Sequence, residues 1–202
     1  MDSEAVWQHI DRERLWTADL LQSLPRGAWE QPSLCEGWSV RDVGAHLTFS
    51  HARLRDVAWP AVRTGFRYNA MIKYCALRSP LTHEEIVATL RCFVGSRRRA
   101  PFVTELEPLL DILVHTQDIC LPLGIDHQMP ADAAVAVADR VLSVRGPMRL
   151  WKPPRQRLVA TDTVWAYGDG PVVQAPMRSH LLTLTGRQPS CPKASVASHA
   201  PA

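Results

Sequence analysis

The sequence predicts a mainly α-helical fold, an up-and-down four-helix bundle with a small α+β appendage at its C-terminal end. Three observations carry this prediction. Apolar residues recur at helical spacing through most of the chain, the expected helices begin at capping signals, and short alternating segments typical of strands follow them. We therefore expect a helical bundle over residues 1–145, a β-containing subdomain over 146–187 and a disordered tail over 188–202.

Length and composition set the class of protein. The 202 residues fit one main domain, and an apolar fraction of 46% is enough for a core. A formal net charge of +3 is too small to indicate a nucleic-acid partner. There is no secretory signal, no apolar run near the ~20 residues of a membrane span, and no C-x-x-C pair among the five cysteines. We expect a globular cytoplasmic protein that binds neither nucleic acid nor membrane.

The first helices follow from capping and breaking signals. A first helix is expected over residues 4–24, where Pro25 stops it. A second begins at the S-x-x-D capping box of Ser39 and runs to about residue 58, before Pro60. Residues 61–78 fit either a short helix or a variable loop across the top of the bundle.

The remaining elements complete the bundle and its appendage. A T-x-x-E capping box at Thr82 opens a helix to about residue 96, an apolar helix follows over 105–121, and an Ala-rich helix over 130–142. Further elements are a small antiparallel sheet and a last short helix, expected at residues 157–162, 164–167, 172–173 and 177–185. The three-arginine run at 97–99 is typical of a solvated helix end, and a phosphate-binding role is the less common alternative.

The helix at 105–121 is the most informative element. Glu107, Asp111, His115 and Asp118 fall within roughly a quarter of its circumference, and the rest is largely apolar. Burying such groups is costly unless they are paired or bind a metal. An internal salt-bridge network and a metal site with Asp111 and His115 as ligands both remain open.

A facing helix supplies a third candidate ligand. His46 lies at the edge of the apolar face of the second helix, where an imidazole is more often a core histidine than a ligand. Metal sites in bundles are built from side chains on facing helices. His46, Asp111 and His115 would together leave an open coordination position for water or substrate.

Three blocks of the sequence resemble a known family. They are GWSVRDVGAHL with the residues before it (32–47), DILVHTQDICLPLG (111–124) and the C-terminal segments between 160 and 187. In this order and spacing they are similar to the mycothiol-dependent maleylpyruvate isomerase family of the DinB-like superfamily. The resemblance covers roughly residues 1–187 and implies a DinB-like four-helix bundle with one divalent metal, usually zinc.

The resemblance also implies a ligand set. It puts the family's first ligand histidine at His46, and its second block, normally E-L-x-x-H-x-x-D, at Asp111 to Asp118. His115 then matches a ligand. Asp111 stands where the family has Glu, which keeps a carboxylate but shortens its reach by one methylene. Asp118 is expected outside the first coordination shell, hydrogen-bonding a ligand histidine.

The activity implied by the resemblance is a metal-dependent isomerase or thiol transferase. Enzymes of this family use the low-molecular-weight thiol mycothiol as cosubstrate, with a small electrophile as the second partner. Arg187 is a candidate for holding a substrate carboxylate, although it also fits a helix-end arginine. Cys35 lies in the first block and is by default a small buried cysteine. The alternative is a non-catalytic DinB-like module that binds a metal or ligand, motivated by Asp111 and by residues 61–78, which could fill the cleft.

Overall fold

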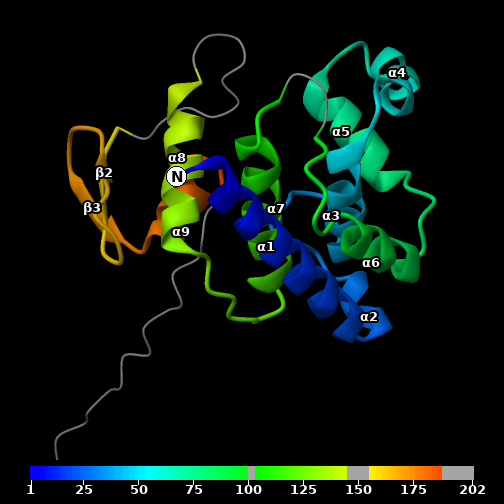
Figure 1. Cartoon of the computed structure of the whole chain (residues 1–202), viewed down its shortest axis with the longest axis horizontal. Coiled ribbons are helices and arrows are strands. Elements are labelled where there is room, and N and C mark those ends of the chain that lie inside the picture. The colour runs from blue at the N-terminus through cyan, green and yellow to red at the C-terminus, as the bar shows by residue number, and fades with distance from the viewer. Residues whose placement is uncertain (100–102, 145–154, 188–202) are drawn as a thin grey trace, which may run out of the picture.

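The structure is a computed structural model, and it describes residues 1–99, 103–144 and 155–187. The elements in chain order are α1 (Ser3–Ser23), α2 (Arg26–Trp29), α3 (Val40–Leu47), the 3-10 helix η1 (Thr48–His51), α4 (Leu54–Arg63), α5 (Tyr68–Leu77), α6 (His83–Cys92), α7 (Leu106–Cys120), α8 (Ala131–Ser143), β1 (Arg157–Ala160), β2 (Ala166–Tyr167), β3 (Val172–Ala175) and α9 (Met177–Leu184). The strands lie at one end of the molecule and α4 at the other (Figure 1). The predicted class, mainly helical with a small C-terminal sheet, is confirmed.

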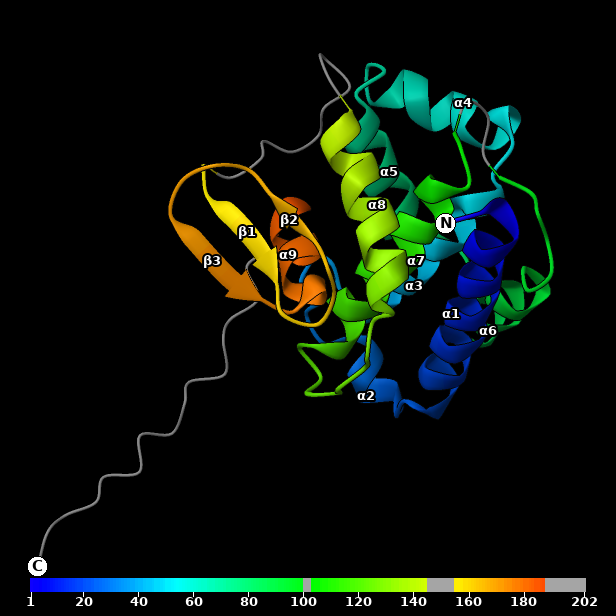
Figure 2. The ribbon, with the colours of Figure 1, turned by 60° about the vertical axis from the view of Figure 1, so that its left-hand side comes forward.

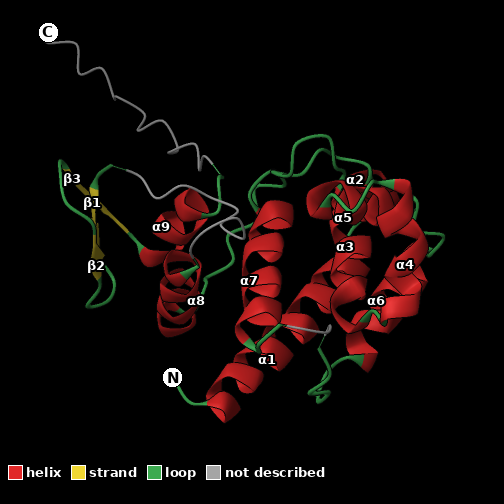
Figure 3. Ribbon diagram, turned by 90° about the horizontal axis from the view of Figure 1, so that it is seen from above, coloured by secondary structure: helices red, strands yellow, loops and turns green. Residues whose placement is uncertain are grey.

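Helix α7 lies at the centre of the bundle. It packs against α1, α3 and α8, while α6 packs against α1 and α3. Seen from above, α8 and α9 lie on one side of α7, and α3 and α6 lie on the other (Figure 3). Apolar residues of α7 therefore enter two core clusters, Leu109 and Leu113 on the first side, Ile112 and Ile119 on the second. This position explains why so little of the α7 circumference is polar.

Capping residues set the starts of two helices as predicted. The Ser39 hydroxyl accepts from the Asp42 backbone N–H, and the Asp42 carboxylate accepts from the Ser39 N–H. Thr82 and Glu85 make the same reciprocal pair at α6. Each pair satisfies backbone donors that the first helical turn leaves free.

The predicted second helix is wrong in its extent. It ends at Leu47, tightens into η1, and a separate helix α4 begins at Leu54. The Arg53 backbone N–H donates to the Asp56 carboxylate, which caps this new start. Pro60 lies inside α4 instead of ending a helix. The segment at 61–78, left open by the sequence, contains the helix α5.

The small sheet is also only partly as expected. β1 pairs antiparallel with β2 but parallel with β3, in the order β2-β1-β3 (Figure 2). The turn after β2 carries the chain across to the far edge of β1. Gly168 in this turn has a φ of +81°, and a Cβ there would lie 2.5 Å from the Gln156 carbonyl oxygen. Only glycine allows that close approach.

Three further expectations concern the arginine run, membrane-spanning helices and the C-terminal tail with its domain boundary. Two arginines of the run at 97–99 are paired within the chain, since Arg97 contacts Asp11 at 2.8 Å and Arg99 contacts Glu105 at 3.0 Å. None of the described helices is long and apolar enough to cross a membrane. The expected tail at 188–202 lies outside the described residues, as does the expected domain boundary at 145/146.

Candidate metal centre

His46, Asp111 and His115 converge between two helices. One ligand atom of each residue lies within 4.8 Å of those of the other two. His46 is in the last turn of α3, and Asp111 and His115 are one turn apart on α7. The two imidazole rings meet edge to face with centroids 4.6 Å apart. The structure thus brings together the three residues that the sequence singled out as ligands.

Asp118 and Arg187 extend this group behind His115. The Asp118 carboxylate Oδ2 lies 2.8 Å from His115 Nδ1, and Arg187 donates from Nη2 and Nε to its two oxygens at 2.6 and 3.1 Å. Asp118 is fully buried. Because the carboxylate can only accept, Nδ1 of His115 carries the proton and Nε2 keeps its lone pair.

The charges of Asp118 and Arg187 stabilise each other. Burial opposes ionisation of Asp118, yet hydrogen bonds from His115 and Arg187 hold its pKa well below the usual range. Burial likewise opposes the charge on Arg187, but Asp118 raises the pKa of the guanidinium above its ordinary value. Both groups are therefore charged at neutral pH. Arg187 also donates from Nη1 to the Thr185 carbonyl oxygen, so each of its nitrogens is engaged.

His46 is held neutral. Burial lowers its pKa well below 6.5, and the neighbouring His115 and Arg187 lower it further. Its buried Nδ1 has no hydrogen-bond partner in the described part of the chain. Trp38 covers both imidazoles, with ring centroids 5.5 Å from His46 and 6.5 Å from His115. A neutral imidazole with an unpartnered buried nitrogen is suited to a cation or an ordered water.

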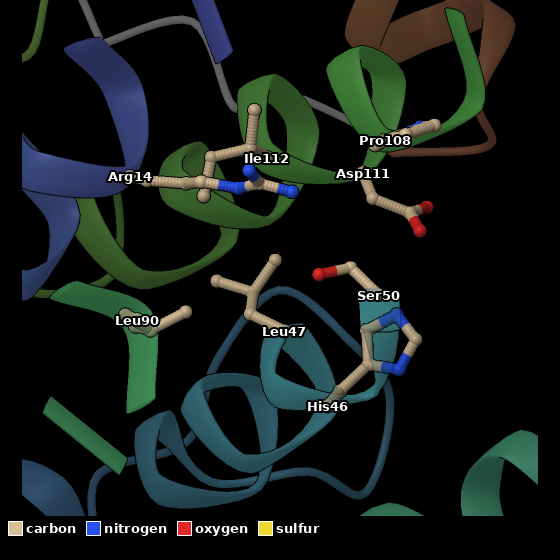
Figure 4. A pocket seen from close by; sticks show the side chains of 8 residues that line it. All are labelled: Arg14, His46, Leu47, Ser50, Leu90, Pro108, Asp111 and Ile112. Carbon is tan, nitrogen blue, oxygen red and sulfur yellow. The ribbon is translucent and has the colours of Figure 1, made fainter. Parts of the chain in front are cut away.

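A small cavity opens beside His46 and Asp111 (Figure 4). Its volume of about 10 Å³ has room for one water molecule. Burial raises the pKa of the Asp111 carboxyl, and Glu107 adds to this, whereas His115 and Arg187 oppose it. The other residues lining the cavity are Arg14, Leu47, Ser50, Leu90, Pro108 and Ile112.

A second group of possible ligands shares His115. Cys35, His115 and Asp118 also offer ligand atoms within 4.8 Å of one another. The Cys35 thiol donates to Asp118 at 3.1 Å, and burial followed by the Asp118 charge raises its pKa to about 12. Its hydrogen bonds are thus complete within the protein, and the sulfur is a neutral thiol. His46, Asp111 and His115, which include an unpartnered nitrogen, fit a divalent cation better.

Alkylation tests the state of Cys35. At pH 8 only about one Cys35 in ten thousand is a thiolate, because its pKa is about 12. We expect iodoacetamide to modify the exposed Cys92 at least about a hundredfold faster than Cys35, by mass spectrometry of the folded protein. Equal rates at the two sites would contradict the hydrogen bond to Asp118.

One expected residue lies outside the site, and two residues that line the cavity were not expected. Glu107 is outside the convergent group, since it accepts from Thr104 and pairs with Arg140 at 2.7 Å. Arg14 and Ser50 line the cavity and were not expected. Ser50 follows His46 by four residues, and this spacing is the one local feature of the sequence that could have suggested it. Arg14 comes from α1, and nothing in its local sequence points to the site.

Comparisons with known proteins concern the family and the fold of the chain. A family model described as the mycothiol maleylpyruvate isomerase N-terminal domain matches residues 11–101. No curated protein sequence matches the chain. Two crystal structures are similar, one of the mycothiol-dependent maleylpyruvate isomerase and one of a histidine-to-alanine mutant of it. The TM-scores are 0.62 and 0.61 at 14% identity, covering 94% and 93% of this chain and 91% and 90% of theirs. At this identity the structures establish the fold alone.

Proposed function

The chain belongs to the mycothiol-dependent maleylpyruvate isomerase family, and from this we propose that it is a metal-dependent enzyme of low-molecular-weight thiols. The proposed cation is divalent, zinc by preference, with His46, Asp111 and His115 as ligands. The proposed cosubstrate is mycothiol, and the second substrate is a small electrophile such as maleylpyruvate. The reaction is either isomerisation of an activated double bond or transfer of the thiol.

One observation carries the proposal. Two imidazoles and one carboxylate from facing helices converge within 4.8 Å of one another, next to a cavity. Nitrogen and carboxylate ligands of this number are typical of catalytic zinc sites that keep one position open. A divalent cation bound there would keep positive charge and lower the pKa of a thiol that coordinates it.

The chain's own residues prepare this site. Asp118 holds the proton on His115 Nδ1, which leaves Nε2 free to act as a ligand and orients the ring. Arg187 holds Asp118 through two hydrogen bonds. We therefore favour a positioning role for Arg187 over its expected role in binding a substrate carboxylate, because its donors already face Asp118 and Thr185.

None of the protein's described cysteines has to supply the reacting sulfur. Cys35, the one beside the site, is a thiol with a pKa of about 12 and is poorly nucleophilic. In the proposed reaction the sulfur arrives with mycothiol. For an isomerisation it adds to the electrophilic carbon and leaves again, so no thiol is consumed. For a transfer it stays bound, so one thiol is consumed per product.

The direct test is an activity assay on the zinc-loaded and the chelator-treated protein. With mycothiol present, maleylpyruvate isomerisation and thiol loss are followed across a panel of small electrophiles. We expect turnover that depends on both metal and thiol. Absence of turnover over the whole panel, with metal bound, would leave the alternative of a non-catalytic metal- or ligand-binding module.

The side chains around the cavity were expected to distinguish the enzyme from that alternative. A bulky side chain filling the cavity would favour a binding module. Tyr68 and Tyr74, the candidates for this, do not line the cavity, and Tyr74 instead lies under the Arg78 guanidinium at 4.9 Å. The cavity has room for a water molecule but not for a substrate, so the activity assay, and not the cavity, decides between the two functions.

Substitution of Asp111 tests whether the shorter carboxylate reaches the cation. Because its oxygen already lies within 4.8 Å of both imidazole ligands, we expect Asp111→Glu to bring no gain in zinc affinity. We expect Asp111→Asn to weaken affinity by about tenfold or more, since the ligand loses its charge. Zinc titration with a competing chelator measures both. A large gain for Asp111→Glu would mean that Asp111 is too short to bind directly.

A further inference from the structure

The segment from Arg53 to Arg67 forms an exposed surface that the proposed reaction does not use. It comprises α4 and the turn into α5, at the end of the molecule opposite the sheet (Figure 3). No residue of α4 is buried. Four large apolar side chains of the segment 53–67 are mostly solvent-exposed: Leu54 61%, Trp59 64% and Val62 57% on α4, and Phe66 79% in the turn after it. An apolar surface of this kind on one amphipathic helix is typical of a binding site.

The same surface is strongly basic. Residues 53–67 contain four arginines and one acid, Asp56, which gives 4 − 1 = +3. The whole chain also has a formal net charge of +3, so this segment carries all of it. Each of the four arginines is exposed, and Arg63 lies over the Trp59 ring at 6.0 Å. Cationic and apolar groups thus share one face.

The backbone holds Phe66 outward. Its φ is +57°, a left-handed conformation that costs free energy for a bulky residue. Gly65 before it has a φ of +61°. The turn between α4 and α5 therefore presents an aromatic side chain to solvent in a strained conformation, with no burial to offset the strain. A ligand that buries Phe66 would offset it.

We propose that residues 53–67 dock onto an anionic membrane surface. The apolar side chains enter the boundary between headgroups and acyl chains, and Arg53, Arg55, Arg63 and Arg67 contact the anionic headgroups. A second copy of the chain fits less well, because a symmetric contact would place +3 against +3. Peripheral binding needs no spanning helix, so it is compatible with the described helices. It differs from the sequence-based expectation that the protein has no membrane partner.

Vesicle co-sedimentation of the full chain tests the proposal. The probes are vesicles of phosphatidylcholine alone and of equal parts phosphatidylcholine and phosphatidylglycerol. We expect binding to the anionic vesicles only, weakened by salt. Trp59→Ser with Phe66→Ser should reduce it about tenfold or more, and each of Arg55→Gln and Arg63→Gln about fivefold.

Two control variants test whether the effect is specific to residues 53–67. Val164→Ser and Arg12→Gln remove an exposed apolar residue and an exposed arginine elsewhere, and should leave binding unchanged. Circular dichroism confirms that each variant folds. Equal binding to neutral vesicles, or no binding to anionic ones, would overturn the proposal. Light scattering tests for a dimer. A dimer that is dissociated by Trp59→Ser with Phe66→Ser, while vesicle binding stays unchanged, would also overturn the proposal.

Discussion

His115→Ala is expected to release the metal from the purified protein. The substitution removes one of three proposed ligands and leaves Asp118 without its imidazole partner. We expect about one equivalent of divalent metal in the wild type, and an affinity lower by more than about a hundredfold in the variant, since even a residue behind a ligand is worth 10–100-fold. Metal analysis after dialysis against a weak chelator measures this.

His83→Ala is the matched control. His83 is a partly exposed histidine of α6 that stacks on Trp29 with ring centroids 4.1 Å apart, outside the convergent group. Its loss should leave the metal content unchanged. If both variants keep the metal, or both lose it with their folds intact, His115 is not a specific ligand.

Asp118→Asn is expected to cause the largest loss of stability. It leaves the Arg187 guanidinium, which is 13% exposed, as a buried cation without its counter-charge. Breaking such a buried pair costs about 3–5 kcal/mol. For a chain of this size that corresponds to a melting temperature lower by roughly 10 °C. Thermal and denaturant unfolding at neutral pH measure the loss.

The pH dependence of this effect has a definite sign. The pKa of Asp118 is depressed in the folded protein relative to about 3.9 in the unfolded chain. Its ionised form therefore stabilises the fold above about pH 4, and this contribution is lost as the pH falls toward the folded pKa. Wild type and Asp118→Asn should converge in stability in acid. A constant difference down to the lowest pH of folding would contradict the ion pair.

Asp19→Asn provides the control for charge removal alone. Asp19 pairs with Arg91 at 2.6 Å, the same separation as the closest contact between Asp118 and Arg187, but both side chains are largely exposed. Exposed pairs contribute about 0–1 kcal/mol because solvent screens them. A similar loss in both variants would mean that burial does not set the strength of the Asp118 contact.

Local patterns predicted most of the helices. The capping boxes at Ser39 and Thr82 predicted two helix starts, and the apolar periodicity predicted α1, α7 and α8 to within about two residues. The break after Leu47 was missed because the Pro60 signal suggested an end, whereas Asp56 caps a new helix. The parallel pairing of β3 was missed because it depends on where the turn at Gly168 carries the chain.

Some residues of the candidate site could be predicted from the sequence and others could not. The spacing on α7 brought Asp111, His115 and Asp118 to one face, and the hydrogen bond expected between Asp118 and a histidine is present. Its contribution to metal binding remains a prediction. The contact of Arg187 with Asp118 joins residues 69 positions apart, and Arg14 reaches the cavity from another helix. Such contacts depend on tertiary packing, which local periodicity does not contain.

The central claim is that a cation binds between His46, Asp111 and His115. The most direct measurement is an anomalous difference map at the zinc edge from crystals of the full chain grown with zinc. We predict one peak bounded by the two imidazoles and the Asp111 carboxylate. A peak held instead by Cys35, His115 and Asp118, or no peak near α3 and α7, would contradict the claim.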